Sequence, residues 1–322
     1  MNAQRDQVLL IGIDGGTWDL LDPLMSDGTM PKLKALLSKG ARGVLHSVDP
    51  PLTPAAWTTV LTGKDPGGHG VFDFLRSFSG FSTLKGRDRR VASSRLLPRP
   101  YLYDHLGNAG KRVISINVPL TYPPHEINGF MITGMFTPPT SDFTYPTALK
   151  KRLKDYEIDL PPQEDPLKAP WQLEKEKATT PIASGPRLVP QASRRLLRKR
   201  TNATLTLMKE ECWDFLFVVF TCPDRICHHF WRTMHDQSNP ALASINEEIR
   251  QFYRELDASI ARLVDAAGPQ TSVLLLSDHG FGPYAKKKLN FDIWLEQEKL
   301  MYRRRWAPLV MLRKMPGNAL AR

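Results

Sequence analysis

The chain has 322 residues, a net charge of +11 and a pI of about 9.6. This length can bury a large core, and a content of 41% hydrophobic and 24% charged residues is typical of a globular protein rather than a disordered one. The positive charge favours anionic partners, such as small phosphate-bearing molecules. The sequence contains no zinc-finger spacing and no long basic helix, so we expect no nucleic-acid partner.

Two features of the sequence bear on where the protein works. The three cysteines, Cys212, Cys222 and Cys227, show no framework spacing and are expected to be reduced thiols. The apolar run at residues 8–13 is too short for a signal peptide core or a membrane span. We therefore predict a cytoplasmic protein without stable membrane insertion, and the oligomeric state stays open.

The first predicted elements come from apolar runs bounded by turn residues. Residues 8–13 form a continuous apolar run that ends at Asp14-Gly15-Gly16, which is typical of a buried parallel strand and a tight turn. Helical spacing predicts a helix at about 33–40, where Gly40 ends it. Val44 and Leu45 indicate a second short strand.

Residues 50–63 are predicted to be a loop that becomes a helix at Thr53. Thr53 occupies an N-cap position, and Pro54 suits the first turn because its missing N–H costs nothing there. A helix N-terminus offers free N–H donors and partial positive charge to a phosphate. Thr53 could therefore be a plain cap or a nucleophile at an anion site, and the local residues favour the cap. A glycine-rich turn follows at 67–74.

The rest of the chain continues this alternation of strands and helices. The further predicted elements are helices at about 101–106, 191–211 and 240–267, and strands at 113–118, 130–133, 215–220 and 272–276. The pattern predicts an α/β fold with a mostly parallel sheet and helices on both faces. A basic stretch at about 78–100 and a proline-rich stretch at about 138–190 are predicted to be surface inserts.

Polar residues gather where three of the predicted strands end. Asp14 follows the first strand, Asp224 and His228 follow the strand at 215–220, and Asp278 and His279 follow the last strand. Because the carboxyl ends of parallel strands share one edge, we expect these groups to meet. Carboxylate and imidazole ligands suit Zn²⁺, and a more oxygen-rich set suits Mn²⁺.

Each of these residues also has an ordinary explanation: a turn for Asp14, a helix cap for Asp224, and a surface position for His228. The complete set favours a site for two divalent metal ions. Two ions about 4 Å apart would clamp a phosphoryl oxygen and lower the pKa of an attacking hydroxyl, which would be that of Thr53. A threonine hydroxyl without such help is a poor nucleophile.

These motifs, taken in order, resemble the alkaline phosphatase superfamily, in its type I phosphodiesterase/nucleotide pyrophosphatase branch. The similarity is greatest to its predicted phosphohydrolases or phosphomutases. The matching segments are residues 12–16, 50–58, 62–63, 69–71, 116–124, 224–231 and 277–282, over about residues 7–295. The resemblance implies a three-layer, alkaline-phosphatase-like fold and a small anionic phosphate-containing substrate.

The resemblance also implies roles for particular residues. One metal would be held by Asp14, Thr53, Asp278 and His279, and the second by Asp224 and His228. Thr53 would attack phosphorus and form a phosphothreonine intermediate that water then hydrolyses. Zn²⁺ is the expected metal, with Mn²⁺ as the alternative. His69 matches a motif position and is expected to be structural.

The sequence departs from the family pattern in two places. Nucleotide pyrophosphatases carry an asparagine three residues after the nucleophile, which steadies a phosphate oxygen, where this chain has Ala56; Asn117 is a candidate substitute. Family members also complete the second metal site with a histidine far beyond the Asp-His-Gly motif, and no histidine follows His279 here. We therefore expect weak binding of the second metal.

These observations leave three functions open. The first is a metal-dependent hydrolase of phosphodiesters, nucleotide pyrophosphates or phosphomonoesters; the second is a phosphomutase with the same site; the third is an inactive binding or scaffold protein. We expect a catalytic core at 1–295 and, at 296–322, the start of a C-terminal part that is cut short. The basic stretch from Lys85 to Arg99 is either a solvated loop or an anion clamp.

Overall fold

The computed structural model describes residues 6–77, 89–138, 140–153, 155–159, 188–236, 239–283 and 290–301. The chain divides into two compact units, residues 1–282 and 283–322. The first unit contains the central sheet, and helix α9 (Phe291–Gln297) belongs to the second. Much of the predicted basic insert and of the proline-rich insert lies outside the described residues.

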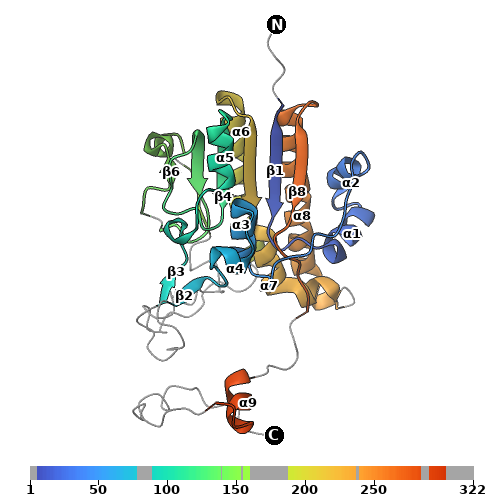
Figure 1. The fold of residues 1–322 in the computed structure, drawn as a ribbon. Coiled ribbons are helices and arrows are strands. Elements are labelled where there is room, and N and C mark those ends of the chain that lie inside the picture. The colour runs from blue at the N-terminus through green and yellow to red at the C-terminus, as the bar shows by residue number, and fades with distance from the viewer. Residues whose placement is uncertain are drawn as a thin grey trace. The chain divides into compact units, whose positions relative to one another are not determined.

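The first unit is built on a six-stranded sheet with the order β6-β5-β4-β7-β1-β8 (Figure 1). Its strands are β1 (Val8–Ile13), β4 (Val113–Val118), β5 (Gly129–Thr133), β6 (Thr144–Tyr145), β7 (Phe215–Phe220) and β8 (Ser272–Leu276). All pairings are parallel except that of β6 with β5. Val8 lies opposite both Phe215 and Ser272, so β1, β7 and β8 run in register and end at the same edge.

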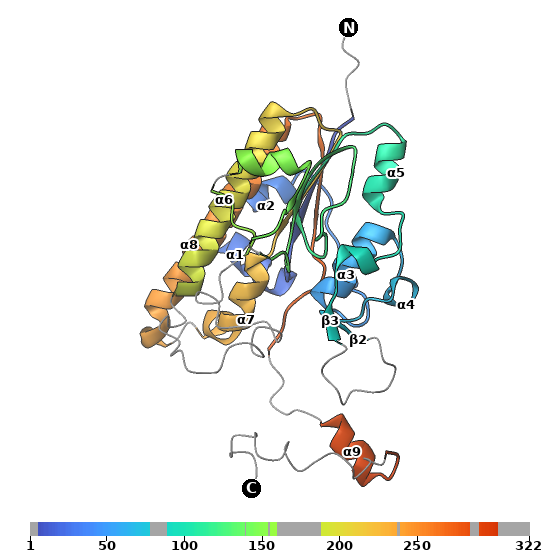
Figure 2. The same cartoon turned by 90° about the vertical axis from the view of Figure 1, so that its left-hand side faces the viewer.

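Helices cover both faces of this sheet (Figure 2). One face carries α1 (Trp18–Ser26), α2 (Pro31–Leu37), α6 (Leu188–Glu210), α7 (Cys222–His235) and α8 (Ala243–Ala267). The other carries α3 (Thr53–Thr62), α4 (Pro66–His69) and α5 (Leu102–Asn108). This arrangement confirms the predicted three-layer α/β fold.

Smaller elements complete the described part of the chain. Strands β2 (Leu75–Ser77) and β3 (Arg89–Val91) form a separate antiparallel pair. Three short 3-10 helices are η1 (Ser94–Leu96), η2 (Thr147–Arg152) and η3 (Pro240–Leu242). No helix within the described ranges combines the length and the apolar character needed to cross a bilayer.

The apolar patterns account for the central layers. Every residue of β4 and of β7 is buried, as expected of interior strands covered on both faces. The apolar stripe of α8 packs on α6 and α2. Asp257 of α8 also accepts the N–H groups of Lys32 (3.0 Å) and Leu33 (2.7 Å), which are free donors in the first turn of α2.

Most of the predicted elements are confirmed, and two local predictions are wrong. Residues 41–48 form no strand, because no backbone hydrogen bond joins them to another described residue. The glycine-rich stretch begins as a short helix, α4, because the Asp65 carboxylate accepts the Gly68 N–H (2.7 Å) at its start. Helix α1 and strand β6 were not predicted: α1 contains Pro23, and β6 has only two residues.

Candidate active site

The candidate active site lies where β1, β7 and β8 end. In Figure 1 the arrows of β1 and β8 point down toward α3, α4 and α7. Asp14 directly follows β1, and its N–H bonds the Phe220 carbonyl at the end of β7 (3.0 Å). Asp224 lies in the first turn of α7, and Asp278 follows β8. The parallel register therefore brings together residues that are 264 positions apart in the chain at most.

Thr53 is the first residue of α3, and the preceding Leu52 occupies the N-cap position. No side chain caps this helix, so the interpretation of Thr53 as a plain cap is wrong. Its hydroxyl instead faces the strand ends: Oγ1 lies 3.1 Å from Nε2 of His279 and 3.4 Å from Oδ1 of Asp14. Thr53 is 4% exposed, so its hydroxyl is held inside the site.

The His279 ring occupies the middle of the acidic group. Its Nε2 lies 3.6 Å from Asp14, 3.4 Å from Asp278 and 4.0 Å from Asp224. Its Nδ1 lies 2.8 Å from the Gly280 carbonyl oxygen, which can only accept, so Nδ1 is the donor. Histidines that bind metals commonly donate their second ring N–H in this way.

The three aspartates are buried together with little compensating charge. Burial raises the pKa of Asp14, Asp224 and Asp278, and the charge of Asp14 raises the pKa of the other two further. Among the described residues, no lysine or arginine forms an ion pair with any of them. One oxygen of Asp224 and one of Asp278 are buried without a hydrogen-bond partner. This donor set fits a divalent cation, which would supply the missing positive charge.

His228 lies one helical turn after Asp224, with Nε2 3.4 Å from Oδ2 of Asp224. Burial and the nearby His279 lower the pKa of His228 to about 4, which favours the neutral ring that binds metals. Phe281 packs edge-on against His228, with 4.8 Å between ring centroids. Asp224 and His228 therefore lie together as predicted, on the same face of α7.

Trp57 is a supporting residue that the sequence did not reveal. Its indole Nε1 donates to Oδ2 of Asp14 (3.2 Å), so it holds the orientation of this carboxylate. A Cβ atom at Gly12 of β1 would lie 2.5 Å from the Trp57 ring, so only glycine allows the indole this close to the strand. Trp57 follows Thr53 by four residues, and that spacing on one helix face was the available signal.

Two serines form hydrogen bonds to the loops that carry Asp14, Asp278 and His279. The Ser277 hydroxyl accepts the Gly16 N–H (2.9 Å) and donates to the His279 carbonyl (2.6 Å). The Ser47 hydroxyl donates to the Asp278 carbonyl (2.6 Å). The sequence alone could not assign these roles to Ser47 and Ser277, because their partners Asp278 and Gly16 lie in distant segments of the chain.

His69 and Asn117 are both engaged in structural contacts. In His69, Nδ1 accepts the Val71 N–H (3.1 Å) and Nε2 lies 3.0 Å from the Thr59 hydroxyl, so both ring nitrogens are used. The Asn117 side-chain amide donates to the Val219 carbonyl (2.8 Å), where the register of β4 with β5 shifts. This bond uses one of the two amide hydrogens, and Oδ1 of Asn117 is buried without a hydrogen-bond partner, so the role of Asn117 as a substitute for the family asparagine stays a prediction.

The sequence matches the type I phosphodiesterase / nucleotide pyrophosphatase family over residues 8–322, and the chain belongs to this family. The match confirms the predicted family. A comparison with curated proteins found no significant match.

Solved structures show the same fold. Phosphonoacetate hydrolase from Sinorhizobium meliloti 1021, in complex with phosphonoacetate, aligns with a TM-score of 0.56 and 18% identity, over 91% of this chain and 62% of that one. BT1596, a 2-O GAG sulfatase, aligns with a TM-score of 0.50 and 12% identity, over 86% of this chain and 58% of that one. The chain therefore spans about three-fifths of the length of these structures.

Proposed function

We propose that this chain is a metal-dependent phosphoester hydrolase that uses Thr53 as its nucleophile. Membership of the type I phosphodiesterase / nucleotide pyrophosphatase family supports phosphoester hydrolysis. The observation that carries the proposal is the buried Thr53 hydroxyl, which lies 3.1 Å from Nε2 of His279 and 3.4 Å from Oδ1 of Asp14, while Leu52 and not Thr53 occupies the N-cap position. A threonine that served only to cap the helix would not require a histidine and a carboxylate beside its hydroxyl.

The residues divide into two candidate metal positions. Ligand atoms of Asp14, Asp278 and His279 all lie within 4.8 Å of one another, and the Thr53 oxygen adjoins them. Asp224 and His228 form the second position. We propose Zn²⁺ at these positions, with Mn²⁺ as the alternative. When bound, the ions would supply positive charge for the phosphoryl oxygens and the Thr53 oxygen.

The reaction would proceed by two displacements. The Thr53 oxygen forms a bond to phosphorus, while the ester P–O bond breaks and its electron pair leaves with the alcohol, which takes up a proton. The Thr53 proton leaves to solvent water, since the atoms beside the hydroxyl, Nε2 of His279 and Oδ1 of Asp14, would be engaged as metal ligands. The N-terminus of α3 would favour the negative phosphoryl group. Water then cleaves the phosphothreonine and restores the hydroxyl.

Two observations bear on the substrate class: the residue at position 56 and the ligand of one structural neighbour. Ala56 presents a methyl group where the family has an asparagine, so this chain lacks a side-chain donor at that position. The neighbour crystallised with phosphonoacetate supports a small phosphorus-containing anion as ligand. We propose a small phosphate ester, with monoesters and diesters distinguished by the experiment below.

The test compares wild type with Thr53→Ala on p-nitrophenyl phosphate and on bis-p-nitrophenyl phosphate, with Zn²⁺ or Mn²⁺ added. Thr62→Ala is the matched control, because Thr62 lies at the far end of the same helix. We expect turnover by wild type and control and at least a thousandfold loss in Thr53→Ala. An acid quench should trap phosphate on the peptide that contains Thr53. Equal rates for wild type and Thr53→Ala would exclude Thr53 as the nucleophile.

The same experiment separates the two alternatives. A phosphomutase would form the phosphothreonine but pass the phosphoryl group to an added acceptor alcohol faster than to water. A binding or scaffold protein would show no turnover and no trapped phosphate, and elemental analysis would find fewer than two metal ions per chain. Because weak binding at Asp224 and His228 is also expected of the hydrolase, the turnover and the trapped phosphate, and not the metal count alone, decide between these functions.

A further inference from the structure

The first turn of α7 is held by a side chain of another helix. Thr221 occupies the N-cap position of α7, yet its hydroxyl caps no N–H of that helix. The hydroxyl instead accepts a hydrogen bond from Nη1 of Arg200 (3.3 Å), which lies on α6. Thr221 directly follows Phe220, whose carbonyl accepts the Asp14 N–H, and precedes Asp224 by three residues. Along the chain, this contact therefore lies between the two candidate metal positions.

The Arg200 guanidinium is buried in an unusual way. The residue is 0% exposed, and arginine is almost never fully buried unless it is paired. Among the described residues, its hydrogen-bond acceptors are two neutral oxygens, the Thr221 hydroxyl and the Ile158 carbonyl (2.9 Å). Its Nε is buried without a hydrogen-bond partner. Burial of this charge costs free energy, and apolar side chains often stabilise such a position better, so packing alone does not account for Arg200.

Residues 155–159 make a second contact with α7. The Asp159 carboxylate pairs with Arg225 (2.6 Å), which directly follows Asp224 in the chain. The two paired side chains are 27% and 13% exposed, so water and salt screen this pair less than a surface pair. Thr221 and Arg225 are thus both bound from outside the helix, on either side of Asp224 in the chain.

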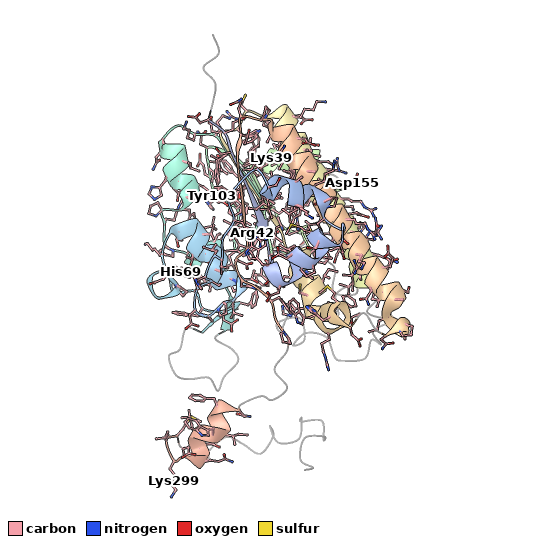
Figure 3. The ribbon with its side chains drawn as sticks, turned by 90° about the vertical axis from the view of Figure 1, so that its right-hand side faces the viewer. Lys39, Arg42, His69, Tyr103, Asp155 and Lys299 are labelled. Atoms are coloured by element: carbon pink, nitrogen blue, oxygen red, sulfur yellow. The ribbon has the colours of Figure 1, made fainter. Side chains whose placement is uncertain are left out.

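The same segment is also attached to α6. Glu157 pairs with Arg195 (3.1 Å) and with Lys199 (2.7 Å), which are both on α6. Figure 3 shows Asp155, the first residue of the segment, on the side of the sheet that carries α8. Because Glu157 and Asp159 hold different helices, the two attachments can be removed one at a time.

The apolar contacts of α7 do not by themselves orient its first turn. Ile226, Phe230 and Trp231 of α7 are buried in the core. Burial of apolar surface is non-directional, so it holds the helix in the core without fixing its rotation closely. Hydrogen bonds weaken steeply when their angle changes. The polar contacts on either side of Asp224 are therefore the ones that fix the direction of its carboxylate.

We propose that Arg200 and Asp159 are positioning residues for the second candidate metal position. Acting through the first turn of α7, they hold Asp224 and His228 in the arrangement that one ion requires, in which Oδ2 of Asp224 lies 3.4 Å from Nε2 of His228. This inference rests on the proposed function, which makes Asp224 and His228 metal ligands. Removal of residues that orient ligands typically lowers metal affinity about 10–100-fold.

The first test removes the contact between α6 and α7. Arg200→Lys keeps the charge but loses the planar fork that binds two acceptors, and Thr221→Val removes the hydroxyl at nearly constant volume. In a titration with Co²⁺, we expect the second ion to bind about tenfold more weakly in both variants and the first ion to stay within about twofold of wild type. Thr221→Ser keeps the hydroxyl and should behave as wild type. Arg198→Lys, on the exposed face of α6, is the control for Arg200→Lys.

The second test compares Asp159→Asn with Glu157→Gln. Each variant removes a carboxylate charge from the same segment, so urea unfolding should show similar losses of stability. We expect only Asp159→Asn to weaken binding of the second Co²⁺ ion, because only Asp159 is paired with α7. NMR of the His228 ring in the metal-free protein should show shifted signals in Asp159→Asn, Thr221→Val and Arg200→Lys, and unshifted signals in the controls.

Three outcomes would overturn the proposal. The first is unchanged second-ion affinity with unchanged His228 signals in Thr221→Val and Asp159→Asn. The second is equal weakening of both Co²⁺ ions, and the third is an equal effect of Glu157→Gln, since both would indicate a general loss of structure. If Arg200→Lys does not fold, Thr221→Val tests the same hydrogen bond. If the wild type binds no Co²⁺, the proposed function fails, while the His228 signals still decide whether these residues position α7.

Discussion

The two halves of the site are held very differently. In the half formed by Asp14, Asp278 and His279, second contacts reach each residue: Trp57 bonds Asp14, the Gly15 N–H bonds Asp278 (3.2 Å), and the Gly280 carbonyl accepts from His279. In the other half, the side chain of His228 is 38% exposed, against 10% for His279; one oxygen of Asp224 and one of Asp278 lack a hydrogen-bond partner, so the halves do not differ in that respect. The residues of the first half are held by more contacts than His228, so under the proposed function we expect the first half to bind its metal ion more tightly.

The strongest way to break this comparison is to remove a ligand from the first half. Asp278→Asn deletes one of three buried carboxylates, so we expect a fall in kcat/KM of about a thousandfold and loss of the tighter metal. Steady-state kinetics and elemental analysis measure the two effects. Asp22→Asn, on the exposed surface of α1, should leave both unchanged. Retention of the tighter metal in Asp278→Asn would contradict the assignment.

Removal of a ligand from the second half should affect binding of the first metal much less than Asp278→Asn does. In His228→Ala, we expect the weaker metal to bind 10–100-fold more weakly, while the affinity of the tighter one stays within about twofold. Titration with Co²⁺, followed by its visible absorption, resolves the two events. If the titration showed a single binding step that shifts in His228→Ala, the two halves would form one site and not two.

The hydrogen bond from Trp57 to Asp14 can be removed to test whether such supporting contacts explain the expected difference in metal affinity between the two halves. Trp57→Phe keeps an aromatic ring beside Gly12 but removes the N–H that bonds Asp14. We expect about tenfold weaker binding of the first metal, and a loss of about 1 kcal/mol in stability of the metal-free protein. Metal titration and urea unfolding measure these changes. An unchanged affinity would mean that Asp14 is held by its backbone alone.

The smallest effect is expected from Phe281, which packs against His228 and Trp231. Phe281→Leu keeps the apolar volume but removes the edge-on aromatic contact, which is worth about 0.5–1.5 kcal/mol. We expect binding of the second metal to weaken about threefold, with no change for the first. Nitrogen-detected NMR of the His228 ring would show greater mobility. Equal weakening at both positions would indicate a general loss of packing.

The sequence was sufficient where local pattern and tertiary environment agree. The apolar runs of β1, β4 and β7 are interior strands, and the aspartates that follow β1 and β8 could be placed because parallel strands end together. The prediction of a strand at Val44 and Leu45 was wrong, because a strand also needs a neighbouring strand to pair with, and the residue types at one position do not show whether the fold supplies one. Trp57, Ser47 and Ser277 could not be assigned, since their partners lie 43 to 261 positions away and only the fold brings them near.

The absence of a side chain at Gly12 has a consequence for how this protein can change. The Trp57 ring fills the space that a side chain at Gly12 would need, and the same ring bonds the Asp14 carboxylate beside the Thr53 hydroxyl. A methyl group added at Gly12, near the end of β1, would therefore displace the indole and with it the hydrogen bond to Asp14. A larger residue at Gly12 would therefore disturb both the packing of the core and the carboxylate beside Thr53, so stability and site geometry are coupled at this position.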